Sequence, residues 1–144
     1  MSLPKRILLW VMGVFYILAG VNHFINAQFY MPMMPPYLPW PAGLVFLSGV
    51  AEVVVGVGVL ISSLRRAAAW VTILLLIAIF PANIHIALNN IPVFGAQQGA
   101  GIWNWVRLPL QGVLILWAWW YTQPDAPPHG QPVLAPERAR RHTG

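Results

Sequence analysis

Two charged side chains interrupt the long apolar stretches of this sequence, and they are the first candidates for chemistry. They are Glu52 and Arg107. A buried carboxyl group can exchange a proton, and a guanidinium group can donate hydrogen bonds to the oxygen atoms of a ligand. Neutral polar residues occur in the same stretches. Our candidate ligand-binding residues are Asn22, His23, Glu52, Asn83, Arg107 and Gln111.

Two histidines raise the question of a haem or metal site. Imidazole binds several transition metals, so His23 and His85 could act as ligands, with Glu52 as a third. The sequence has no His-x-x-His or His-x-x-x-His spacing. Asn83 and His85 are about 200° apart on an ideal helix, and of the two we expect Asn83 to point inward. We therefore do not favour a haem or metal site, and no cysteine is present for a thiolate site or an iron–sulfur cluster.

The composition indicates which elements position these residues. Of the 144 residues, 58% are hydrophobic and 8% are charged, whereas a soluble domain has about 25% charged residues. This excludes a disordered chain, a disulfide-rich secreted fold and a two-domain enzyme. A membrane-spanning helix needs about 20 apolar residues, and four stretches qualify: 7–25, 43–61, 67–88 and 104–121. We predict an all-α fold, a four-helix transmembrane bundle over residues 1–122.

The basic residues predict the orientation of this bundle. If four helices alternate in direction, all Lys and Arg residues except Arg107 fall on one side, which the positive-inside rule assigns to the cytoplasm. Both termini are then cytoplasmic, and the six candidate residues lie in the outer half of the membrane. We predict that residues 123–144 form a Pro-rich, basic, disordered cytoplasmic tail. The first outer loop, residues 26–42, contains five prolines. We therefore expect it to be a stiff, extended segment that covers the outer end of the bundle, and not a helix.

Helical spacing shows which of these side chains can meet. Arg107 and Gln111 are four residues apart and share one helix face. Gly49, Glu52 and Gly56 form a stripe on which a second helix can approach closely. Two interpretations stay open, and they do not exclude each other. In one, a Glu52–Arg107 pair and interhelical hydrogen bonds fix the packing; in the other, the polar residues line a pocket for a small molecule.

Several short motifs in this order resemble the DoxX-like family of small membrane proteins. They lie at residues 19–24 (AGVNHF), 35–39 (PPYLP), 47–52 (LSGVAE), 80–84 (FPANI), 107–111 (RLPLQ) and 117–121 (WAWWY). The resemblance covers about residues 5–122 and implies a compact four-helix membrane fold. Related proteins include membrane subunits of thiosulfate:quinone oxidoreductase, a subunit of a complex linked to oxidative-stress defence, and distant chaperones of nicotinic receptors. The resemblance therefore implies a bacterial plasma (inner) membrane protein but no single activity.

Three functions are compatible with these observations. The first is a membrane subunit of a redox system that binds a quinone or another lipophilic ligand, with a redox partner protein. The second is a scaffold or assembly factor in which the polar cluster is structural. The third, a transporter or channel, is least favoured because no polar stripe reaches the inner half. The partners we expect are the lipid bilayer and a further copy of the chain, and no nucleic acid.

Overall fold

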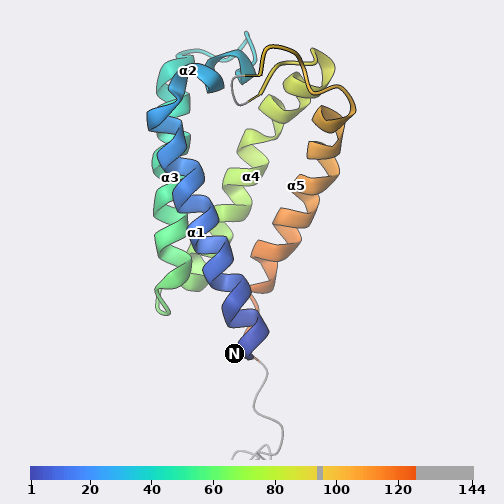
Figure 1. The fold of residues 1–144 in the computed structure, drawn as a ribbon. Coiled ribbons are helices and arrows are strands. Elements are labelled where there is room, and N and C mark those ends of the chain that lie inside the picture. The colour runs from blue at the N-terminus through green and yellow to red at the C-terminus, as the bar shows by residue number, and fades with distance from the viewer. Residues whose placement is uncertain (94–95, 126–144) are drawn as a thin grey trace, which may run out of the picture.

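The fold is built from helices alone in the part of the chain that can be described. The structure is a computed structural model that describes residues 1–93 and 96–125. No strand occurs in these residues, so the predicted all-α class is confirmed. Each predicted apolar stretch coincides with a long helix except for its last residue at 61 and at 121, and residues 126–144 of the tail predicted at 123–144 lie outside the described residues. The long helices are α1 (Leu3–Ile25), α3 (Pro41–Leu60), α4 (Arg65–Leu88) and α5 (Ile102–Trp120) (Figure 1).

Three of these helices are long and apolar enough to cross a membrane. They are α1, α3 and α4. Helix α5 has a suitable length, but Asn104, Arg107 and Gln111 lower its mean hydropathy. The chain is therefore consistent with an integral membrane protein, and the fourth span stays a prediction.

The segment between α1 and α3 differs from its prediction. We expected residues 26–42 to be extended and without a helix, which is wrong for residues 27–33. These residues form the short helix α2 (Ala27–Tyr30) and a 3-10 turn, η1 (Met31–Met33). Pro32 lies in the first turn of η1, where a backbone N–H has no partner within the helix, so the proline costs no hydrogen bond. Residues 34–40 have turns but no helix.

Small residues bring α1 and α3 into close contact. A Cβ atom added to Gly56 would lie 2.7 Å from the Gly13 carbonyl oxygen, and one added to Gly20 would lie 2.5 Å from the Gly49 oxygen. The predicted glycine stripe on α3 therefore does face a neighbouring helix. Helix α3 also packs on α4, and α4 packs on α5. The apolar core lies toward the end of the molecule where α1 begins, which we call the N-terminal end; it includes Met12, Val59 and Ala69.

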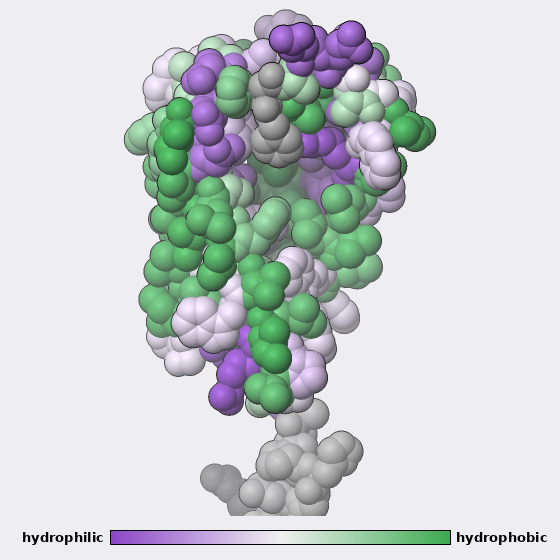
Figure 2. Space-filling view, in the orientation of Figure 1, coloured by the Kyte–Doolittle hydropathy of each residue, from purple (hydrophilic) through white to green (hydrophobic). Residues whose placement is uncertain are grey.

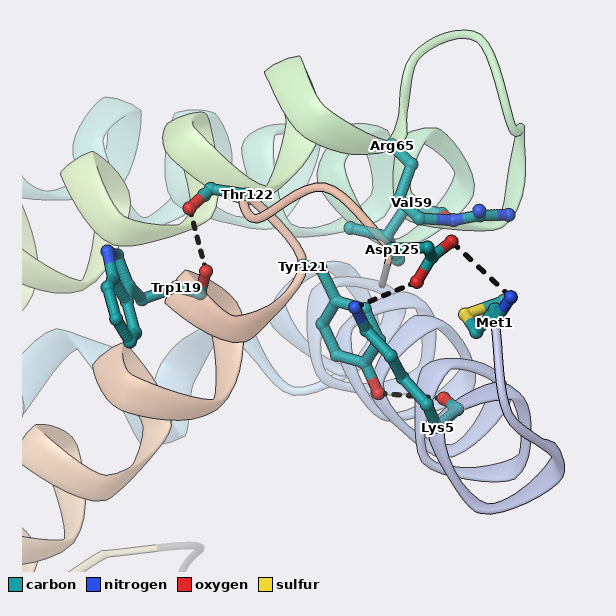
Figure 3. A network of polar contacts seen from close by, with 8 residues as sticks. All are labelled: Met1, Lys5, Val59, Arg65, Trp119, Tyr121, Thr122 and Asp125. Carbon is teal, nitrogen blue, oxygen red and sulfur yellow. Dashed lines mark hydrogen bonds and ion pairs between the residues drawn. The ribbon is translucent and has the colours of Figure 1, made fainter. Parts of the chain in front are cut away.

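Helices α1 and α5 meet only at the N-terminal end. The Tyr121 hydroxyl, directly after α5, donates a hydrogen bond to the Lys5 carbonyl at 3.0 Å. The Lys5 ammonium donates to the Asp125 carboxylate at 3.1 Å, and Figure 3 shows these contacts. We call Lys5, Tyr121 and Asp125 the clasp. Along their lengths α1 and α5 do not pack against each other, and they diverge toward the opposite, distal end (Figure 1).

Candidate functional site

A cavity of about 770 Å³ lies between the diverging helices in the distal half. Its size is in the range of small-molecule pockets, about 300–1,000 Å³. All four long helices, α2 and η1 contribute to its walls. Figure 2 shows a recess in this half of the molecule, with hydrophilic surface near its distal rim and hydrophobic surface below. The walls include all six residues singled out from the sequence: Asn22, His23, Glu52, Asn83, Arg107 and Gln111.

One polar group of this cavity joins α1 to α3. The His23 Nδ1 atom lies 3.0 Å from the Val45 carbonyl oxygen and 3.0 Å from the Ser48 hydroxyl. A carbonyl oxygen can only accept, so this contact places a proton on Nδ1. The Nε2 atom then faces Glu52, whose Oε2 atom is 3.6 Å away. Because Glu52 is buried, this carboxyl group and imidazole form a pair that can hold one proton between them.

A second polar group comes from the segment that covers the distal end. The Asn22 amide donates to the Tyr30 hydroxyl at 2.6 Å, and the Asn26 amide donates to Asn22 at 2.6 Å. The Tyr30 ring also stacks on the His23 ring, with their centroids 3.8 Å apart. Burial raises the pKa of the Tyr30 hydroxyl above its usual value. Tyr30 is therefore protonated at neutral pH and has an O–H to donate to a ligand.

The third polar group joins α4 to α5 across the cavity from His23. The Asn83 amide donates to the Gln111 side-chain oxygen at 2.7 Å. The Gln111 amide donates in turn to the Leu76 carbonyl. Arg107 lies one helical turn from Gln111 and lines the same cavity. The sequence predicted interhelical hydrogen bonds without naming their partners; this one joins Asn83 on α4 to Gln111 on α5.

Glu52 has a partner that we did not predict. The structure pairs its carboxylate with His23, on α1. Arg107 is half-buried on α5, a helix that does not pack on α3. A direct Glu52–Arg107 pair stays a prediction. Tyr30 lines the same cavity as both residues.

His23 and His85 do not lie together. Asn83 lines the cavity, as expected, whereas His85 is not among the lining residues. The His85 ring accepts a hydrogen bond from the Asn89 amide at 3.0 Å on the exposed end of α4. Within residues 1–93 and 96–125, no three His, Asp or Glu side chains come together in a group that could hold a metal ion.

Sequence reasoning missed two polar residues of this site, Ser48 and Tyr30. Ser48 lies four residues before Glu52 and therefore on the same face of α3, a signal that was present in the sequence. Tyr30 had no such signal, because the sequence predicted an extended loop there. The short helix α2 places its ring on His23.

Comparison with known protein families identifies the family of this chain. A protein family described as a domain of unknown function (DUF8561) matches residues 12–122. The chain belongs to the DUF8561 family. The matched region contains every residue that lines the cavity of this DUF8561 chain. No curated protein and no solved structure matches.

Proposed function

We propose that this DUF8561 chain is a DoxX-like membrane protein with four transmembrane helices. Support for α5 as the fourth span comes from the direction of its side chains. Asn104 and Gln111 are buried, while Leu110, Val113 and Leu116 are exposed. A helix that turns its polar residues inward and its apolar residues outward fits a lipid environment. Large apolar side chains are also exposed along α1, α3 and α4, where a soluble monomer would rarely leave such a surface.

The orientation we propose places both termini in the cytoplasm of a bacterium, with the chain in its plasma (inner) membrane. Lys5 is at the N-terminal end of the molecule, and α4 begins at the same end with Arg65 and Arg66, which line one cleft with Lys5. The positive-inside rule assigns such an end to the cytoplasm. Exposed tryptophans near both ends fit the two interfaces of a membrane: Trp10, Trp70, Trp119 and Trp120 at one, Trp40, Trp103 and Trp105 at the other.

The activity we propose is binding of a quinone, or another small lipophilic ligand, as a membrane subunit of a redox system. The observation that carries this proposal is the cavity itself, because it combines apolar walls with hydrogen-bond donors on two sides. Tyr30 and Arg107 could donate to ligand oxygens, and the His23–Glu52 pair could hold a proton next to them. A bound quinone would supply two-electron, two-proton redox chemistry. A redox partner protein, or a second copy of the chain, would complete the system.

Quinone binding to the purified chain tests this proposal. In mild detergent we expect a water-soluble ubiquinone analogue to bind, and Glu52→Gln to weaken binding about 10–100-fold, because hydrogen bonds to charged groups contribute about 1.5–3 kcal/mol. The matched control is Asp125→Asn, which removes a carboxylate at the other end of the molecule. Asp125 does not line the cavity, so the equilibrium affinity should stay unchanged even if the ligand enters and leaves at a different rate. Equal affinity of Glu52→Gln and the parent would contradict the assignment of Glu52.

A structural role for the same residues is the second candidate function. It is favoured by the contacts that tie helices together, between His23 and Glu52 and between Asn83 and Gln111. In this case the chain is a scaffold or assembly factor without a ligand. Glu52→Ala and Arg107→Ala would then lower the unfolding temperature by the same amount with and without quinone. If quinone instead raised the unfolding temperature of the parent but not that of the variants, ligand binding would be favoured.

A further inference from the structure

The cavity opens through the side of the molecule. Phe15 and Leu18 on α1 line it, as does Leu110 on α5. The same residues are 47%, 64% and 50% exposed on the outer surface. Side chains that both line a cavity and face outward mark its mouth, so the mouth lies between α1 and α5 and is apolar. Figure 2 shows hydrophobic surface on both sides of the recess.

The helix arrangement explains why the opening lies there. Long helices that follow one another in the chain are in contact: α1 with α3, α3 with α4, and α4 with α5. The first and last of them, α1 and α5, do not pack on each other. The clasp holds them together at the N-terminal end. Phe15 lies ten residues after Lys5, which is about 15 Å along a helix. The opening therefore begins well inside the apolar part of α1, at a depth that lipid chains would reach in the proposed orientation.

The polar end of the cavity lies under the segment between α1 and α3. Tyr30 from α2 and Met33 from η1 both line the cavity, and Met33 is buried. Tyr30 is held there by its hydrogen bond with Asn22 and by its stacking on His23. The polar groups are thus at the covered end, and the apolar mouth is at the side.

We infer that the ligand is an amphiphile with a hydrocarbon tail, and that it passes between the cavity and the bilayer through the mouth between α1 and α5. Its polar head lies among the groups at His23 and Arg107, and its tail extends past Leu18 and Leu110 into the lipid. This inference rests on the proposed membrane location and ligand-binding function. It adds the ligand class and the route of entry.

A thiol placed in the cavity tests the route without knowledge of the ligand. The parent chain has no cysteine, so Ser48→Cys introduces a unique thiol at a lining position. The protein is placed in vesicles of phosphatidylethanolamine and phosphatidylglycerol. It is then treated with decyl methanethiosulfonate, which enters the bilayer, or with the charged sulfonatoethyl reagent, which stays in water. We expect the decyl reagent to label faster; faster labelling by the charged reagent would show a mouth open to water and overturn the inference.

A bulky residue in the mouth provides the second arm. In the Ser48→Cys background, we expect Leu110→Trp to slow decyl labelling about tenfold, a barrier higher by about 1.4 kcal/mol. The matched control is Val113→Trp, because Val113 is exposed on the same helix but does not line the cavity. If Leu110→Trp fails to fold, Leu18→Trp blocks the other edge, with Val14→Trp as its control. Equal rates in a mouth variant and its control would overturn the inference.

The two proposals can fail separately. If quinone does not bind the parent, but the decyl reagent still labels faster than the charged one and Leu110→Trp still slows it, the quinone assignment is wrong. The lateral mouth then serves another amphiphile. If quinone binds but the mouth variants label at the parent rate, the cavity is a quinone site with a different entrance.

Discussion

The two halves of the molecule use the same four helices in opposite ways. In the N-terminal half, small side chains such as Gly13, Gly56 and Ala69 let the helices approach, and the apolar core fills the space between them. In the distal half, α1 and α3 stay in close contact at Gly20 and Gly49, but α5 does not pack on either of them, and polar side chains face each other across a cavity. The two halves therefore contribute differently. Close packing at the N-terminal end stabilises the fold, whereas hydrogen bonds at the distal end hold the helices in position and leave the cavity between them open.

The largest expected effect comes from disturbing the packed half. A Cβ atom on Gly56 would meet backbone atoms of α1, the Gly13 oxygen at 2.7 Å and the Ile17 nitrogen at 2.9 Å. Backbone cannot move aside as a flexible side chain can, so we expect Gly56→Ala to lower the free energy of unfolding by about 1–3 kcal/mol. Thermal unfolding in mild detergent measures the change.

The same substitution on α5 is the control for this prediction. A Cβ atom on Gly112 has no neighbour within 4 Å. Alanine is a better helix former than glycine by about 1 kcal/mol, so Gly112→Ala should raise the unfolding temperature. If both variants shifted the temperature in the same direction, close packing of α1 on α3 would not be what stabilises this half.

Most of the helix positions could be predicted from the sequence, because the basic pairs at 5–6 and 65–66 and the proline-rich loop at 26–42 bound the apolar stretches. The helices nevertheless begin earlier than the stretches do: α1 begins at Leu3 and α3 at Pro41. Pro4 and Pro41 lie in the first turn of these helices, where a missing N–H costs nothing. Apolar composition alone does not indicate the residue at which such a helix begins.

The candidate site could be predicted for a different reason. A polar side chain within an apolar helix has few stable positions other than the interior, so the six residues were expected to converge. The contribution of Tyr30 could not be predicted, since it depends on the short helix α2. Nor could the contact between Lys5 and Asp125, which are 120 residues apart. Local patterns carry no information about a pairing over that distance.

The distal half should tolerate the loss of an interhelical contact better than the packed half. Asn83→Ala removes the hydrogen bond from Asn83 to Gln111. Interhelical hydrogen bonds in membrane proteins contribute about 0.6 kcal/mol on average, so we expect a smaller loss of stability than for Gly56→Ala. Because Asn83 lines the cavity, the same variant should weaken quinone binding.

Unfolding temperatures and quinone titrations of the same samples measure both effects. The control is Asn89→Ala. In the described part of the chain, the Asn89 side chain hydrogen-bonds only to His85, and it does not line the cavity. A loss of stability for Asn83→Ala as large as that for Gly56→Ala would remove the distinction between the two halves.

The smallest expected effect concerns the clasp and its dependence on pH. The hydrogen bond from the Lys5 ammonium holds the pKa of the Asp125 carboxyl below its usual value. Because the folded pKa lies below the unfolded one, the pair contributes its full stability above about pH 4. That contribution disappears as the pH falls through the lowered folded pKa. The Asp125 side chain is 44% exposed, so solvent screening limits the effect to about 0.2–0.5 kcal/mol.

Asp125→Asn tests how much the ion pair of the clasp contributes to stability. At pH 7 we expect it to lower the unfolding temperature slightly, and below the lowered pKa of Asp125 we expect the variant and the parent to converge. Salt at about 1 M, where charges are screened within about 3 Å, should reduce the difference at pH 7 as well. Labelling of Ser48→Cys by the decyl reagent adds a second readout, since a weaker clasp lets α1 and α5 separate further. A labelling rate that does not change with Asp125→Asn would mean that Tyr121 and the apolar core hold the two helices together without help from the ion pair.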